Sequence, residues 1–344
     1  MHSLHRQGRS GQREEWVCEI CNLRGLSQEE GDVMSNYLLQ AGLVASQFAL
    51  AFIFGWIFYW LFRKLRARFQ CRIGPPIIQP LADIVKLFSK KTIMPSAASR
   101  PWFTIAPLLA LAGYLTALAL TPLGVAAPLS VTGDVLVVLI ALAIPGVSII
   151  IAGSSSGNPY GAIGSSRELT LLVASEIPFV VSAIALVKAA GGLSMASIIA
   201  AQSGTPFLFS YPFAAVAFFI ALVLKLGRKP FDIPDAEVEI VAGPLTDYSG
   251  SLLGLFELGN VFRWIVLPAI AVDLFFAGGR FTGIPLVDVA CFLALCVVIV
   301  FIVSYVDSQS TRLRVDQAFK FLLAWGLALA LIDLIRASTG WLVW

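Results

Sequence analysis

Long apolar runs separated by short polar segments recur along most of the chain. Windows of about twenty mostly apolar residues are long enough to cross a bilayer as helices. Such windows predict eight membrane spans, near residues 36–62, 101–121, 134–153, 169–188, 207–226, 252–276, 286–306 and 318–337. These spans leave no stretch long enough for a large soluble domain. The pattern therefore predicts an all-α polytopic membrane protein with structured loops on one side.

Composition agrees with this prediction. The chain of 344 residues is 58% hydrophobic and 13% charged, and the basic residues gather at the ends of the predicted spans without a nucleic-acid-binding motif. We therefore expect the lipid bilayer as a partner, and not a nucleic acid.

Residues 1–33 differ from the rest, because they are polar, mixed in charge and without periodicity. We expect the translated chain to start at Met34, and residues 34–344 to form a single transmembrane domain. Cys18 and Cys21 have the spacing of a metal-ligand pair, but no second pair accompanies them. We therefore expect no metal site in this chain.

Charge is distributed unevenly between the predicted loops. Nine basic residues lie between 63 and 100, whereas the segments 122–133 and 189–206 carry no charge. Because basic loops stay on the cytoplasmic side of a cell membrane, the odd-numbered loops are predicted to face the cytoplasm. Both termini are then expected outside.

Two acids stand inside predicted spans. Glu176 lies in "LLVASEIPFVV" and Glu257 in "LLGLFELGNVF". A carboxylate inside a bilayer is costly, so it usually faces a protein interior, a water pocket or a partner, and proton exchange is a common reason for it. Pro178 frees a backbone carbonyl near Glu176, and Glu168 lies about two turns earlier on the same side. The alternative is a neutral or paired acid that only holds helices together.

Four further acids lie nearer to predicted span ends: Asp273, Asp288, Asp307 and Asp333. For these, solvation at the membrane interface or a helix cap is the simpler expectation.

The most acidic segment is "GRKPFDIPDAEVEIVAGPLTDYSG" at 227–250, which follows the fifth predicted span. Pro234 favours a helical first turn, so a short helix is predicted to run on to Gly243-Pro244. Its acids alternate with apolar residues, which favours a packed helix over a plain acidic surface loop. The acids of the segment are Asp232, Asp235, Glu237, Glu239 and Asp247.

Four segments together resemble a known family. They are "RIGPPIIQPLADIVKLFSKK" at 72–91, "GNPYGAIGSSRELTLLVASE" at 157–176, "KPFDIPDAEVEIVAGPLTDYSG" at 229–250 and "STRLRVDQ" at 310–317. All four fall in the loops predicted to be cytoplasmic. In this order they resemble the membrane protein shared by respiratory complex I, where it is the H or first core subunit, and the energy-converting membrane-bound [NiFe] hydrogenases.

The resemblance implies roles for individual residues. In the family, this subunit anchors a soluble redox arm to the membrane arm, and its buried acids begin a proton route. The residues that would form this route by resemblance are Glu168, Glu176, Asp235, Glu237 and Glu239, and Glu257 is added to them as an acid inside a predicted span. Residues that would anchor loops or docked subunits are Arg72, Arg167, Arg228, Asp232, Asp247 and Arg312, and ordinary positive-inside charge is the alternative for the arginines.

Details of the motifs favour the hydrogenase branch of this family. "GPL" at 243–245 and "GNPYGAIGSSRE" at 157–168 look more like that branch. We therefore expect a proton- or sodium-coupling subunit of an energy-converting hydrogenase. We expect this chain to bind no cofactor. Its expected partners are large and small redox subunits, which would carry the [NiFe] centre and the iron–sulfur clusters, and antiporter-like membrane subunits. The alternatives are the quinone-site subunit of a complex I-type dehydrogenase, with a bound quinone, and a passive membrane anchor.

Overall fold

A computed structural model describes residues 40–124, 127, 129, 131–202, 204–234 and 241–340. The chain divides between two compact units after Ser46. In the first unit, residues 40–46 form the opening turns of a helix, and the Ser46 hydroxyl donates to the carbonyl of Leu43 at 2.8 Å. The second unit begins at Gln47 and contains the rest of the described residues.

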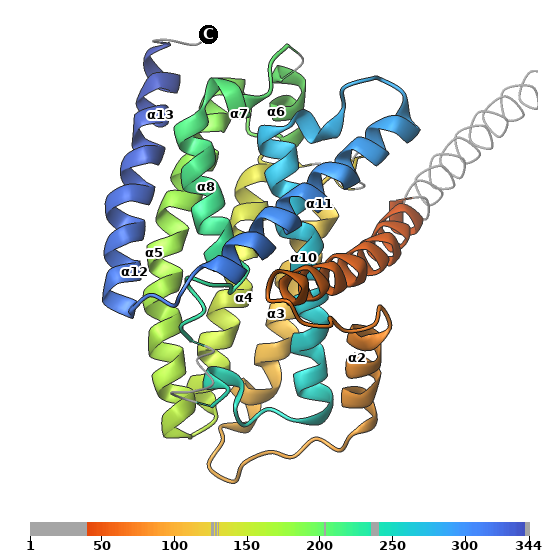
Figure 1. The fold of residues 1–344 in the computed structure, drawn as a ribbon, viewed down its shortest axis with the longest axis vertical. Helices are drawn as coiled ribbons and strands as arrows, with labels where there is room; N and C mark the ends of the chain where they lie inside the picture. The colour runs from red at the N-terminus through yellow and green to blue at the C-terminus, as the bar shows by residue number, and fades with distance from the viewer. Residues whose placement is uncertain are drawn as a thin grey trace, which may run out of the picture. The chain divides into compact units, whose positions relative to one another are not determined.

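The described residues form helices and no β-strand (Figure 1). Seven helical segments among them are long and apolar enough to cross a membrane. They are α1 (Gln40–Phe69), α3 (Arg100–Leu120), α4 (Asp134–Ser155), α5 (Pro159–Ala190), α10 (Gly250–Phe275), α11 (Pro285–Gln309) and the segment Val315–Thr339. The last consists of α12 (Val315–Phe321), the π-helical turn η3 (Leu322–Gly326) and α13 (Leu327–Thr339). The predicted all-α polytopic membrane fold is confirmed.

Shorter helices connect and flank these segments. They are α2 (Gln79–Ser89), α6 (Met195–Ala201), α7 (Phe207–Ser210), α8 (Pro212–Lys225), and the 3-10 turns η1 (Gly243–Leu245) and η2 (Ala277–Gly279). In Figure 1, α11 crosses the bundle obliquely, while α5 runs along its full height.

The fifth predicted span, 207–226, is not one continuous helix. It is divided at Tyr211 into α7 and α8, and α8 has only 14 residues. Pro212 cannot continue a hydrogen-bonded helix from α7. A carboxylate oxygen of Asp333, on α13, instead accepts the Ala214 backbone N–H at 2.7 Å. This acid caps α8 from another helix, and eight predicted spans become seven long helices and one shorter one among the described residues.

The fourth predicted span begins too late in the sequence. Its helix, α5, starts at Pro159, where the Asn158 side chain accepts the Tyr160 backbone N–H at 3.0 Å. A proline in the first turn behind an asparagine cap is a strong start signal. Arg167 and Glu168, which were expected in a loop, therefore lie on α5.

Two ends of the bundle differ in character. Among the described residues, the end that carries 70–99, 156–158, 226–234, 241–249 and 310–314 is called the cavity end. The end that carries 121–124, 131–133, 191–202, 204–211 and 276–284 is called the opposite end. Helix α10 joins the two ends through the core, where Trp264 is fully buried and stacks on Phe62 of α1 with ring centroids 4.4 Å apart.

The acids predicted at span ends have different surroundings. Asp288 accepts the Thr282 backbone N–H at 3.0 Å and its hydroxyl at 2.8 Å, and so closes the turn before α11. Asp288 and Asp333 thus satisfy backbone groups at the starts of helices, as expected for capping acids. Asp307 instead forms an ion pair with Arg66 at 2.9 Å.

Asp273 fits neither expectation. It is fully buried in α10, so it is not solvated at an interface. Its carboxylate has no hydrogen-bond partner among the described residues, so it caps no helix there.

Candidate functional site: a charged cavity between the helices

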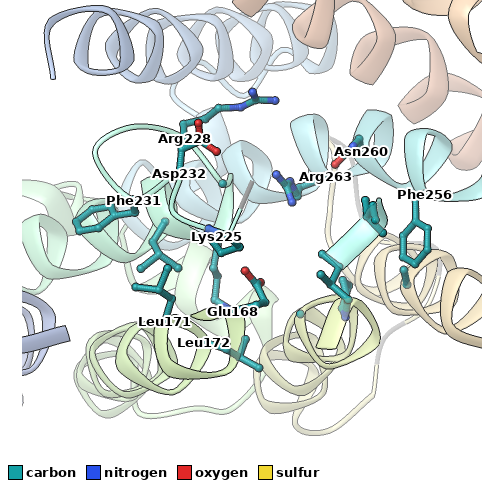
Figure 2. Close-up of a pocket in the computed structure, with 18 of the residues that line it drawn as sticks. Glu168, Leu171, Leu172, Lys225, Arg228, Phe231, Asp232, Phe256, Asn260 and Arg263 are labelled. Atoms are coloured by element: carbon teal, nitrogen blue, oxygen red, sulfur yellow. The ribbon is translucent and has the colours of Figure 1, made fainter. Parts of the chain in front are cut away.

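A cavity of about 1040 Å³ opens at the cavity end of the bundle. Its walls come from α1, α3, α4, α5, α8 and α10, together with residues of the segments 227–234, 242–246 and 310–312. Apolar side chains such as Leu142, Leu171 and Phe256 alternate there with charged ones. Figure 2 shows Glu168 pointing into the cavity from α5, and Arg263 pointing toward the same space from α10.

Charged side chains line this cavity in unequal numbers. The cationic ones are Arg66, Lys225, Arg228, Lys229, Arg263 and Arg312, and the acidic ones are Glu168, Asp232 and Glu257. Among the described lining residues, cations therefore outnumber acids by six to three. Such a site attracts anions and stabilises carboxylates near it.

A lysine–glutamate ion pair joins α8 to α5 beside the cavity. The Lys225 ammonium donates to a carboxylate oxygen of Glu176 at 2.5 Å, and the two side chains are 6% and 21% exposed. Lys225 lines the cavity, and its ammonium also lies 4.6 Å from the centroid of the Phe179 ring. A pair this well shielded from bulk water interacts more strongly than a surface pair, and each charge depends on the other.

Arg228 is held by aromatic rings at the wall of the cavity. Its guanidinium carbon lies 4.5 Å from the Phe62 ring centroid and 5.4 Å from that of Trp264. Its buried Nε–H has no hydrogen-bond partner in the described part of the chain. Burial lowers the pKa of Arg228 from its ordinary value, although an arginine keeps its charge near neutral pH. The structure thus presents a cation with one unused donor.

The segment that follows α8 is tied to the segment that follows α11. The Lys229 backbone N–H donates to Asp307 at 3.1 Å, and the Leu313 backbone N–H donates to the Pro230 carbonyl at 3.1 Å. Arg312 forms an ion pair with Asp232 at 3.0 Å. These three contacts fix one rim of the cavity from both sides.

The "GPL" segment, η1, fixes a second rim by close packing. A Cβ added to Gly164 would lie 2.7 Å from Pro244, and one added to Gly153 would lie 2.9 Å from it. Only glycine lets α4 and α5 approach η1 this closely. Behind it, Asp247 accepts a hydrogen bond from the Asn158 amide at 3.1 Å. In this structure the segment therefore has a packing role.

The structure brings several of the predicted residues together and separates others. Lining the cavity are Glu168, Glu257, Arg228, Asp232 and Arg312, and Glu176 lies directly behind Lys225. Outside the lining lie Arg72, which is exposed, Arg167 on α5, and Asp247. Asp235, Glu237 and Glu239, like Cys18 and Cys21, lie outside the described residues, so their predicted roles stay predictions. Pro234 and Ala242, which flank the acidic segment, both line the cavity.

Sequence reasoning missed several polar lining residues: Tyr59, Tyr114, Lys225, Tyr248, Asn260 and Arg263. Arg263 had a clear signal, because it is a cation inside the predicted span 252–276. Its guanidinium donates to the Leu226 carbonyl at 2.5 Å, at the end of α8. Lys225 had no such signal, because a lysine at the end of a span is typical of the basic residues on the cytoplasmic side.

Comparison with known proteins assigns the chain to a family. The model of the NADH dehydrogenase family matches residues 42–338, nearly the whole described chain. This chain belongs to the NADH dehydrogenase H-subunit family. The H subunit of the NADH-quinone oxidoreductase of Geobacillus kaustophilus is 33% identical over 88% of this chain and 94% of its own length. That of Dehalococcoides mccartyi is 34% identical over 79% of this chain and 78% of its own length.

A solved structure shares the fold of this member of the H-subunit family. It is a chain of the membrane-bound sulfane sulfur reductase, an archaeal respiratory membrane complex. That chain is 31% identical, with a TM-score of 0.79, and the match covers 88% of this chain and 99% of that one. The expected family is confirmed. The hydrogenase branch is not, because the relatives named above carry NADH-quinone oxidoreductase names.

Proposed function

We propose that this chain is the ion-coupling membrane subunit of a complex I-type respiratory oxidoreductase. Soluble redox subunits would dock on the cavity end, which faces the cytoplasm by the positive-inside rule. Antiporter-like membrane subunits would continue the path within the membrane. Support comes from the names of the relatives, from the membrane fold and from the charged cavity at the end that carries the basic loops.

The Lys225–Glu176 pair carries this proposal. Lys225 has Glu176 on one side and the cavity, with Glu168 on its wall, on the other. A lysine between two acids can pair with one of them at a time, and the acid that it leaves is then favoured in its protonated form. Movement of the lysine would therefore pass a proton between the cavity and α5. A charge that appears in the cavity during electron transfer would bias this movement.

Glu257 and Glu168 face the same cavity from α10 and α5. We assign them to the proton path on this basis. Asp235, Glu237 and Glu239 remain predicted members of the path, since they belong to the segment between the lining residues Pro234 and Ala242.

The test is Glu176→Gln in the complete complex, reconstituted in sealed vesicles. Glutamine keeps the size of the side chain and removes its proton site. We expect an assembled complex whose electron transfer no longer drives ion movement. The matched control is Asp83→Asn, which breaks the half-exposed Asp83–Arg63 pair of α2 at 3.2 Å and should leave coupling intact. Normal ion movement by Glu176→Gln would support the passive anchor instead.

A quinone site in the same cavity is the second candidate, and the unused Arg228 donor favours it. A quinone head group offers carbonyl acceptors and a flat ring, which match one free N–H beside an apolar and aromatic wall. Leu142, Leu171 and Phe256 would provide that wall. Arg228→Gln should then raise the KM for a water-soluble quinone more than it lowers kcat. An unchanged KM would remove Arg228 from quinone binding.

The hydrogenase interpretation differs in the electron partner and not in the membrane chemistry. An adjacent gene for a large subunit with two intact CxxC motifs, together with hydrogen-dependent activity of the purified complex, would establish it. Quinone-dependent activity without hydrogen turnover would establish the quinone oxidoreductase that the relatives favour.

A further inference from the structure

Asp273 differs from the other acids predicted near span ends, because its buried carboxylate accepts no hydrogen bond from the described part of the chain. It lies on α10, two residues before that helix ends at the opposite end of the bundle, and it is 0% exposed. An ionised carboxylate in such a place is strongly unfavourable, so the site favours the neutral acid, which carries a proton.

The side-chain amide of Gln202 lies close to Asp273 but donates its hydrogen bonds to backbone carbonyls. The buried Gln202 amide donates to the backbone carbonyls of Asp273 and Leu274 at 3.2 and 3.1 Å. The amide oxygen of Gln202 accepts the backbone N–H groups of Phe207 and Ala277 at 3.2 and 2.9 Å. Gln202 thus ties the end of α10 to α7 and η2 and leaves the acid of Asp273 without a donor.

Turn η2 covers Asp273. Gly278 of η2 lies against it, since a Cβ added there would be 3.1 Å from Oδ1 of Asp273 and 3.2 Å from Ile199 of α6. Gly278 is itself buried, and the chain becomes exposed directly after η2, at residues 280–287. The buried acid is therefore covered by a glycine-containing turn that leads to the surface of the opposite end.

The groups that face Asp273 do not offer it a fixed counter-charge at bonding distance. The titratable groups that interact electrostatically with Asp273 are the buried Cys296 thiol of α11 and the exposed Arg280 beyond η2. Helix α6, "MASIIAA", carries no titratable residue, and the only one in α8 is Lys225, at the far end of that helix. Protonation, and not an ion pair, is therefore how this site neutralises the Asp273 carboxylate.

Helix α10 also connects this acid to the cavity. Glu257 lines the cavity from the same helix, sixteen residues earlier, which corresponds to about 24 Å along the axis. We propose that Asp273 is a proton-carrying residue that serves proton release or uptake at the opposite end, on the same helix as the cavity acid Glu257. This inference rests on the proposed coupling function and adds a second exchange site to it.

Two measurements on the intact complex test the proposal. The first is labelling with a hydrophobic carbodiimide, which reacts with protonated carboxyl groups in apolar surroundings. Mass spectrometry of the peptide that contains Asp273 should show the adduct, and the same peptide of the Asp273→Asn variant should lack it. The hydrogen-bonded Asp288 at the same end of the bundle should not react.

The second measurement is the ratio of protons moved to electrons transferred in sealed vesicles. We expect Asp273→Asn to lower this ratio while electron transfer continues, Asp273→Glu to restore it, and the control Asp288→Asn to leave it unchanged. If Asp273→Asn fails to assemble, the labelling of the wild-type peptide still decides, because an unlabelled Asp273 overturns the inference.

An unlabelled Asp273, or an unchanged ratio in the Asn variant, overturns the inference. Failure of the proposed function is distinct, because it shows as an absence of coupled proton movement in the wild-type complex or as full coupling in Glu176→Gln.

Discussion

The two ends of the bundle use acidic side chains in different ways. At the cavity end, acids pair with cationic side chains, as in Glu176–Lys225, Asp232–Arg312 and Asp307–Arg66. At the opposite end, they accept backbone N–H groups, as in Asp333 with Ala214 and Asp288 with Thr282. Asp333 also pairs with Arg336 at 2.7 Å, within one turn of its own helix.

The difference follows from where the cations are. The segments 122–133 and 189–206 contain none, and the cations nearest to them in the sequence and the fold are few, such as Lys188, Arg280 and Arg336, so acids at this end rely mainly on backbone N–H groups. A backbone N–H is fixed in place and cannot exchange partners. A lysine or arginine side chain can. The cavity end is therefore suited to moving charge, and the opposite end to fixing helix ends, with Asp273 as the exception.

The largest expected effect is that of Lys225→Met, which removes the cation from the cavity-end pair. Glu176 would be left behind the cavity wall without its partner, and the loss of one partner of a shielded pair is strongly destabilising. We expect coupled turnover to fall by at least about tenfold, which corresponds to about 1.4 kcal/mol on the barrier. Turnover and ion movement in vesicles measure this.

Lys188→Met is the matched control. Lys188 lies in the last turn of the same helix that carries Glu176, but it is exposed and near the opposite end. It should leave turnover unchanged. Equal losses in the two variants would contradict the assignment of charge movement to the cavity end.

Sequence alone predicted the membrane fold and most spans, because repeated apolar runs of this length are rare outside membrane-spanning helices. It missed the break at Tyr211. Pro212 was a local signal for this break, but the segment 207–226 is otherwise mostly apolar, and the cap on α8 comes from Asp333, more than a hundred residues later. The start of α5 was missed in a similar way, since Asn158-Pro159 was a local signal that hydropathy outweighed.

Sequence alone predicted only part of the candidate site. Glu176 and Glu257 stood out because acids are rare in spans, and Glu168 stood out because it lies about two helical turns before Glu176. Arg263 should have stood out equally. Their partners did not, because pairing depends on how α5, α8 and α10 pack. The distance between Lys225 and Glu176, 49 residues apart in the chain, is a tertiary fact.

An intermediate effect is expected for Asp333→Asn at the opposite end. The amide keeps the acceptor but loses the charge that faces the first turn of α8 and Arg336. The cap is kept, because asparagine also accepts from the backbone N–H, and the lost charge interaction costs ~1 kcal/mol. The thermal midpoint should fall by a few degrees, while turnover per assembled complex stays unchanged. A fall in turnover without a shift in the midpoint would break the division between the two ends.

The smallest expected effect comes from Tyr248→Phe, which tests whether the cavity end also has purely structural contacts. Tyr248 stacks on Phe103 with ring centroids 4.0 Å apart, and its hydroxyl donates to the Phe103 carbonyl at 2.9 Å. Phenylalanine keeps the stacking and leaves that carbonyl without a donor. We expect a loss of ~1 kcal/mol near neutral pH, measured as a small fall in the thermal midpoint.

The pH dependence of this difference gives the sharper test. Burial raises the pKa of Tyr248 to about 12 from a usual value of 10.0. Because the unfolded chain loses the phenolic proton first, the stabilisation from the neutral tyrosine is complete below about pH 10 and is lost as the pH rises toward about 12. The midpoints of wild type and Tyr248→Phe should therefore converge between these values. A gap that stays constant across this range would mean that the phenol of Tyr248 has the same pKa in the folded and the unfolded chain.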